Sequence, residues 1–127
     1  MIIDVHAHLG DDFVFDIAQN EADLLSAYDA CGVDKAIVQP FIYRPYLSDM
    51  RAAHDRIARL CRTHSGRIYG MASINPHFRP EDYETEAQRC IRDLGFVGLK
   101  ISTIGTATSP SSRDGFHVFE VARTLKV

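Results

Sequence analysis

The chain has 127 residues, with 14 Lys and Arg against 17 Asp and Glu and a formal net charge of −3. Its 46% hydrophobic and 24% charged residues are typical of one soluble globular domain and exclude intrinsic disorder or a collagen-like fibre. The acidic balance provides no basic surface for nucleic acid or an anionic membrane, and no apolar run is long enough to span a bilayer.

Short strand-like runs alternate with longer helical runs along the whole chain. The first helix has Asn20 as its expected N-cap and ends before Gly32, and the third begins at Pro80. Strands are predicted over 1–8, 36–39, 68–74 and 97–101, and helices over 20–31, from Ser48 onward, over 80–95 and over 115–126. The pattern is four successive βα units, with no linker and no second domain.

Alternating strands and helices of this length predict a parallel sheet with right-handed crossovers. The loops that lead from strand to helix are long (9–19, 40–47, 75–79 and 102–114), and the loops back to the next strand are short. Long loops at the carboxyl ends of parallel strands are where α/β enzymes carry their active sites. No G-x-G-x-x-G follows the first strand, which excludes a Rossmann site, whereas the periodicity leaves a flavodoxin-like sheet open.

The first strand carries polar side chains where a central parallel strand should be apolar. Strand alternation predicts that Asp4, His6 and His8 share one face, with the two imidazoles about 7 Å apart along the strand. Neutral imidazole nitrogens so placed can share one metal ion, typically zinc. A hydrogen-bonded structural role for the two histidines is the alternative, and the residues alone leave both interpretations open.

The cysteines indicate a reducing compartment. Cys31, Cys61 and Cys90 are odd in number, lie far apart and form no C-x-x-C pair, which argues against a disulfide framework and a zinc ribbon. No basic leader with a long apolar stretch precedes the first strand. We therefore predict a cytoplasmic protein.

Three segments, in order along the chain, resemble one known family. Residues 2–10 look like the opening D-x-H-x-H strand of the amidohydrolase superfamily. Residues 67–76, which end in Asn-Pro, and residues 95–101, of the form G-F-x-G-x-K, are similar to the third and fourth strands of its amidohydrolase-related (amidohydrolase 2) branch. The resemblance implies a TIM (β/α)8 barrel. Since such a barrel takes about 250 residues, we expect residues 1–127 to be a single partial domain, the N-terminal half, that ends before the fifth strand.

The resemblance also implies a metal-dependent enzyme. It assigns His6 and His8 as metal ligands, most simply of Zn²⁺, and places the remaining ligands and the aspartate general base on later strands, outside these 127 residues. The implied reaction is hydrolysis, in which a metal-activated water attacks a carbonyl-type bond of a small organic substrate. The alternatives are a decarboxylase (a lyase) with the same metal ligands, and an inactive truncated fragment.

Two further residues are candidates for direct chemistry. Lys100 ends the fourth predicted strand; in some amidohydrolases a lysine there is carbamylated, and the alternative is an ion pair with a carboxylate such as Asp4. Arg44, between Tyr43 and Tyr46, suits a substrate carboxylate, although an exposed arginine on a proline-stiffened loop is equally compatible.

The remaining candidates have weaker support. Residues His77, Arg79 and Arg113 lie on loops of the same side, His54 is expected on the surface, and the 102–115 loop is expected to be mobile or a lid. The open edges of a half-barrel predict association with another copy of the chain.

Overall fold

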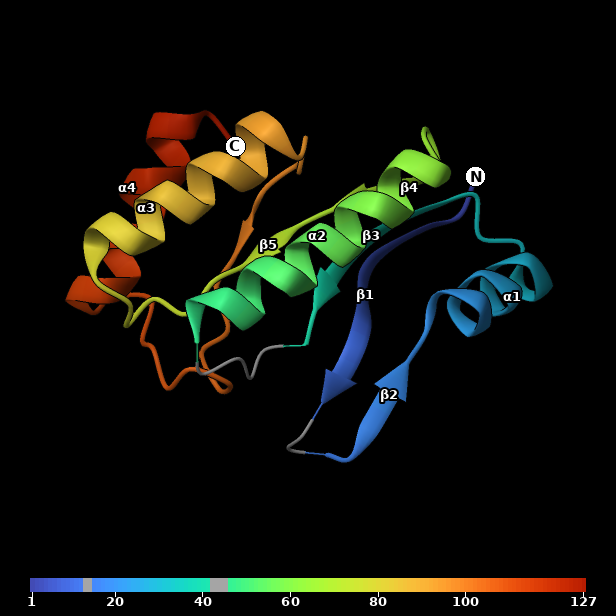
Figure 1. The fold of residues 1–127 in the computed structure, drawn as a ribbon, viewed down its shortest axis with the longest axis horizontal. Helices are drawn as coiled ribbons and strands as arrows, with labels where there is room; N and C mark the ends of the chain where they lie inside the picture. Colours follow the sequence, from blue (N-terminus) through green and yellow to red (C-terminus); the bar gives the residue numbers. More distant parts are fainter. Residues whose placement is uncertain (13–14, 42–45) are drawn as a thin grey trace.

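The computed structural model describes residues 1–12, 15–41 and 46–127. Strands and helices alternate as the sequence predicts (Figure 1). The strands are β1 (Ile3–Asp12), β2 (Ile17–Gln19), β3 (Lys35–Pro40), β4 (Ile68–Gly70), β5 (Ala72–Ser73) and β6 (Leu99–Lys100). The helices are α1 (Glu21–Cys31), α2 (Leu47–Thr63), α3 (Pro80–Gln88), the π-helix η1 (Arg89–Asp93) and α4 (Arg113–Leu125).

The long strands form one continuous parallel arrangement. β1 pairs with β3 and β3 with β4, all parallel, and β5 pairs with β6 in the same sense. Around Met71 the chain changes neighbours: the Met71 N–H donates to the Val38 carbonyl at 2.9 Å, and the Ala72 N–H donates to the Gly98 carbonyl at 3.0 Å. β4 and β5 are therefore two parts of one strand, and the order β1, β3, β4/β5, β6 gives four parallel strands, each followed by a helix.

The helix ends follow the local sequence. The Asn20 side chain accepts the Asp23 N–H at 2.9 Å, and Gly32 closes α1 at a φ of 67°, as the sequence predicts. Pro80 occupies the first turn of α3, where a missing N–H costs nothing. The predicted third helix is one run of 80–93 whose last turn widens to the π-helix η1.

The core lies between the helices and one face of the strands, and Figure 1 shows α2 crossing in front of β3, β4 and β5. The strands contribute small and branched apolar side chains, and each helix contributes an apolar stripe. Gly70 is required here, because a Cβ on it would lie 2.3 Å from a ring carbon of Phe96, itself only 3% exposed. The strand residues of the core are Ala7, Leu9, Ala36, Val38, Ile68 and Ala72, and Ile74 follows directly after β5.

The first strand departs from the prediction by being longer. β1 continues to Asp12 and pairs antiparallel with β2, with Gly10 opposite Gln19 and Asp12 opposite Ile17. The predicted loop over 9–19 is therefore largely a hairpin. In this hairpin the backbone groups form hydrogen bonds between the two strands, whereas in a loop they would bind water. The pattern of side chains in the sequence does not predict this pairing.

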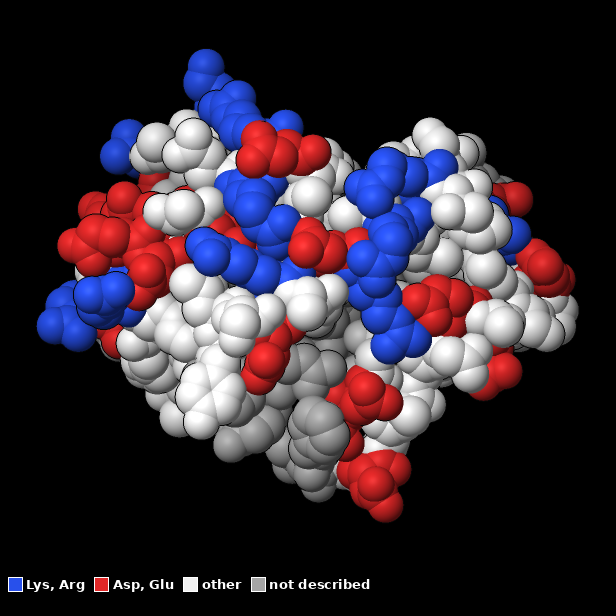
Figure 2. Space-filling model, viewed as in Figure 1, with Lys and Arg blue, Asp and Glu red and all other residues white. Residues whose placement is uncertain are grey.

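Opposite charges interleave on the helical face. Figure 2 shows basic side chains across this face with acidic ones between them, and several form ion pairs between elements. Arg56 of α2 holds Glu21 of α1 through two hydrogen bonds of 2.7 Å, and Arg67 pairs with Asp29 at 2.7 Å.

Among the described residues, no helix has the length and apolar character needed to cross a membrane.

Candidate metal centre

His6 and His8 point their ring nitrogens at a common position. Their Nε2 atoms lie 3.0 Å apart, and the ring centroids lie 5.0 Å apart. Two nitrogens that each lie about 2.0–2.1 Å from a shared ion, at ligand angles of about 90–110°, are separated by about 3 Å. The spacing of the two side chains therefore fits two ligands of one divalent ion.

Asp4 does not share this face, contrary to the sequence prediction. The register between β1 and β3 shifts between Asp4 and Ala7, so a bulge interrupts the alternation. Asp4 accepts a hydrogen bond of 3.0 Å from the hydroxyl of Tyr28 on α1, and its other oxygen accepts the His6 N–H at 2.9 Å. Asp4 is thus a support for the bulge that aims His6, and the predicted alternative of an ion pair between Asp4 and Lys100 is absent.

The backbone fixes the ring of His8 in the form that binds metal. His8 Nδ1 lies 3.2 Å from the Pro40 carbonyl oxygen, which can only accept, so Nδ1 carries the proton and Nε2 keeps its lone pair. Phe41 stacks on the ring at 4.8 Å. Burial, with the charge of Lys100 nearby, lowers the pKa of His8.

Lys100 completes this group from the far strand. Its Nζ lies 2.7 Å from His6 Nε2, and burial lowers its pKa. The ammonium can only donate, so His6 Nε2 also has a lone pair, and two unprotonated imidazole nitrogens lie beside a single cation. The structure brings together three of the four predicted site residues, His6, His8 and Lys100; the fourth, Arg44, lies outside the described residues.

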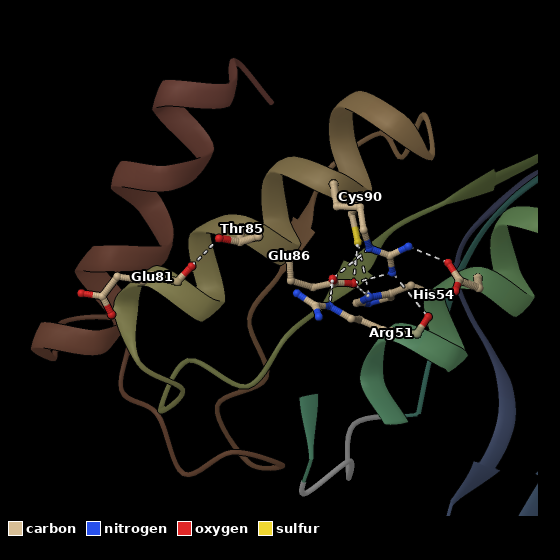
Figure 3. Close-up of polar contacts among 8 residues, drawn as sticks. Arg51, His54, Glu81, Thr85, Glu86 and Cys90 are labelled. Carbon is tan, nitrogen blue, oxygen red and sulfur yellow. Dashed lines mark hydrogen bonds and ion pairs between the residues drawn. The ribbon is translucent and has the colours of Figure 1, made fainter. Parts of the chain in front are cut away.

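A second group of ligand-type side chains lies under α2 and α3. His54, Glu86 and Cys90 are fully buried, and each could offer one ligand atom to a metal ion. Figure 3 shows them pointing toward one another, with Arg51 directed at the same carboxylate. His54 was expected on the surface; its complete burial corrects that prediction, and α2 is amphipathic with His54 on its inner face.

The hydrogen bonds of this group identify it as a structural network. The Ser73 N–H donates to His54 Nε2 at 3.2 Å, so Nδ1 carries the proton and donates to Glu86 at 2.8 Å, which leaves His54 no free lone pair. Glu86 also accepts from Arg51 at 2.9 Å and from Arg89 at 2.8 and 2.9 Å. Although burial alone would raise it, these hydrogen bonds lower the pKa of Glu86 to about 2. Burial raises the pKa of the Cys90 thiol, so without a bound metal this thiol stays protonated.

The loop residues that were weaker candidates for the site, His77, Arg79 and Arg113, form hydrogen bonds or ion pairs with neighbouring residues. His77 donates to Asp114 at 2.7 Å and contacts the Thr106 carbonyl at 2.8 Å, which ties the start of α3 to the 102–112 segment. Arg79 and Arg113 form exposed ion pairs with Asp82 and Asp114. The 102–112 segment is folded on itself, with Thr108 fully buried, rather than extended as an open lid.

Comparison with known proteins shows which family the chain matches. Residues 3–127 match the model of the protein family described as Amidohydrolase. Among proteins of curated function, none matches the sequence significantly.

Solved structures share the fold over almost the entire chain. A 2,6-dihydroxybenzoate decarboxylase from Rhizobium superposes with a TM-score of 0.73 at 19% identity, over 99% of this chain and 47% of that one. A 5-carboxyvanillate decarboxylase from Novosphingobium aromaticivorans, complexed with manganese and a nitrobenzoic acid, gives 0.77 at 17% identity over 99% and 48%. A dihydroxybenzoic acid decarboxylase from Polaromonas, with manganese and 2-nitroresorcinol, gives 0.76 at 18% identity over 99% and 47%.

These likenesses show the fold of the chain. At sequence identities this low they do not show which reaction it catalyses. The chain spans about half the length of the structures it matches. Four βα units of a partial (β/α)8 barrel are what the sequence predicts, and that prediction is confirmed.

Proposed function

The chain belongs to the amidohydrolase family, and from this premise we propose that it supplies half of the catalytic barrel of a metal-dependent enzyme acting on a small carboxylate. The observation that carries the proposal is the 3.0 Å separation of the His6 and His8 Nε2 atoms, each of which has a lone pair that an ion could bind. These two residues would hold the ion. When bound there, a divalent metal supplies Lewis-acid chemistry, polarising a substrate oxygen and lowering the pKa of water.

The chain's own residues have separable roles in this proposal. His8 is oriented by Pro40, and His6 by the Asp4-supported bulge. Lys100 occupies the cation's place beside His6; when an ion is bound, its ammonium is repelled and becomes free to pair with an anionic substrate. Arg44, on the loop that follows β3, is proposed as a second contact for the substrate carboxylate.

Two imidazoles are fewer than the three protein ligands that a catalytic metal site uses. We therefore propose that further polypeptide, equivalent to the other half of the matched structures or a second copy of the chain, completes the barrel. Large apolar side chains that such a half would cover are exposed on β1 and α4: Ile3 (50%), Val5 (65%), Phe116 (59%) and Phe119 (49%).

As the first candidate reaction we propose decarboxylation of an aromatic carboxylate; the cation beside the site supports it, and the decarboxylases among the compared structures are compatible with it. Hydrolysis at a carbonyl, the first expectation from the sequence, is the second candidate and is supported by the family match. For the ion we propose Mn²⁺ or Zn²⁺: manganese is present in two of the compared structures, and zinc is what paired imidazoles favour.

Product analysis on the polypeptide that contains this chain tests the proposal. With Mn²⁺ and 2,6-dihydroxybenzoate, we expect release of CO₂ and resorcinol that is lost in a His6→Ala/His8→Ala variant and kept in His64→Ala, which changes the histidine at the end of α2. Turnover of an ester or amide without CO₂ release would select hydrolysis. Equal turnover in the double variant would refute the metal site.

A further inference from the structure

Gln39 is a buried amide at the metal position that neither the motifs nor the compared structures assign. It lies near the end of β3, only 2% exposed, and in the parallel register it is directly opposite His8. Side chains opposite each other in a sheet share a face, so Gln39 lies on the same side as the two imidazoles. Its Nε2 is 3.3 Å from His8 Nε2.

The orientation of this amide follows from His8. The Pro40 carbonyl fixes the proton on His8 Nδ1, so His8 Nε2 can only accept, and the partner facing it must be the NH₂ group of Gln39. The other end of the amide, Oε1, is buried and has no hydrogen-bond partner within the described part of the chain. Among the described residues, the side chain of Gln39 thus makes one hydrogen bond, and it makes it to a proposed metal ligand.

That hydrogen bond and an ion at His8 exclude each other. The single lone pair on His8 Nε2 either accepts the Gln39 N–H or binds the ion. An occupied site therefore leaves both ends of a buried amide unpaired, which is unfavourable unless a new partner arrives. The Lys100 ammonium is displaced from His6 in the same event, since it also occupies the lone pair of a ligand. The N–H donors of Gln39 on β3 and Lys100 on β6 would then be free to bind another group.

We propose that Gln39 is a substrate-positioning residue: it holds His8 Nε2 while the site is metal-free, and in the loaded site its NH₂ group donates to a carboxylate oxygen of the substrate. The assignment rests on the proposed function, because it requires an ion at His6 and His8. A carboxylate is the complementary group, since it offers acceptors to both Gln39 and the Lys100 ammonium and neutralises the charge of the latter. Gln39 would therefore weaken the binding of the ion and strengthen the binding of the carboxylate.

Calorimetric titration of the polypeptide that contains this chain with Zn²⁺, and of its Zn²⁺-loaded form with benzoate, tests this. Gln39→Met keeps the length of the side chain and removes its donor; Gln88→Met, on the exposed side of α3, is the matched control. We expect Gln39→Met to bind Zn²⁺ two- to tenfold more tightly, because the competing donor is gone, and to bind benzoate at least tenfold more weakly. The control should match the wild type in both titrations.

The outcomes separate this assignment from the proposed function. Unchanged Zn²⁺ and benzoate affinities in Gln39→Met, or a parallel loss of both with a lower melting temperature, would overturn the positioning role and leave the metal site intact. No Zn²⁺ binding by the wild-type polypeptide that contains this chain would refute the proposed function and the Gln39 assignment with it. As a readout independent of affinity, the side-chain amide signals of Gln39 in ¹⁵N spectra should shift when Zn²⁺ is added.

Discussion

The Glu86 network should make the fold sensitive to acid in a way that one substitution removes. Glu86 is fully buried and accepts charge-assisted hydrogen bonds of 2.8–2.9 Å from Arg51, Arg89 and His54. It joins α2 to α3, and His54 extends the connection to β5 through the Ser73 N–H. Breaking a buried ion pair by removing one partner costs about 3–5 kcal/mol, so we expect Glu86→Ala to destabilise the chain by about that amount.

The pH dependence gives the sharper prediction. In the folded chain the hydrogen bonds lower the pKa of Glu86 from 4.5 to about 2, which corresponds to about 3 kcal/mol of stability. Because the folded pKa is the lower one, this contribution is fully present above the unfolded value of 4.5. It is lost as the pH falls from about 5 toward 2.

Urea unfolding followed by circular dichroism at pH 6 and pH 2.5 measures this difference. The free energy of unfolding should fall by about 2–3 kcal/mol more in the wild type than in Glu86→Gln, which cannot titrate. Glu81→Gln, an exposed carboxylate on the same helix, should behave like the wild type. An identical pH dependence in wild type and Glu86→Gln would show that the carboxylate is not ionised in the folded chain and refute the network.

Two further predictions concern other contacts. The hydrogen bond to Asp114, and then the one to the Thr106 carbonyl, raise the pKa of His77. The contact between His77 and Asp114 therefore stabilises the loop below pH 6.5, and this stabilisation is lost as the pH rises through the folded pKa. NMR titration of His77 should give a midpoint above 6.5 that falls in Asp114→Asn, and an unchanged midpoint in that variant would contradict the contact. Gly70→Ala should destabilise the fold by about 1–3 kcal/mol through its clash with Phe96, whereas Gly98→Ala, with only a 3.6 Å contact to Met71, should cost little. Equal melting temperatures for the two glycine variants would contradict the packing described.

Local signals in the sequence predicted most of the fold. Asn20, Gly32 and Pro80 mark helix ends because they act on neighbouring backbone groups, and the structure confirms all three. The β1–β2 hairpin and the bulge after Asp4 were missed, since both depend on how two strands pair rather than on the residues of one. A strict alternation therefore placed Asp4 wrongly beside His6.

The candidate site was predictable only where a motif carries it. His6 and His8 are two residues apart, and the structure brings their Nε2 atoms to 3.0 Å. Gln39 and the Glu86 network gave no signal, because their partners lie 31–35 positions away and an isolated glutamine or histidine has no distinctive pattern. The register of β1 against β3, which aligns His8 with Gln39, is the information that the sequence alone lacks.

Direct measurement of ion binding tests the central claim, that His6 and His8 hold one divalent metal. Titration calorimetry with Zn²⁺ or Mn²⁺ on the polypeptide that contains this chain should give one ion per His6–His8 pair for the wild type and for His64→Ala, and no binding at the same concentrations for His6→Ala/His8→Ala. Because the double variant keeps His54, Glu86 and Cys90, it also separates the two groups of ligand-type residues. Equal ion binding by the wild type and the double variant would contradict the account and move the metal elsewhere in the molecule.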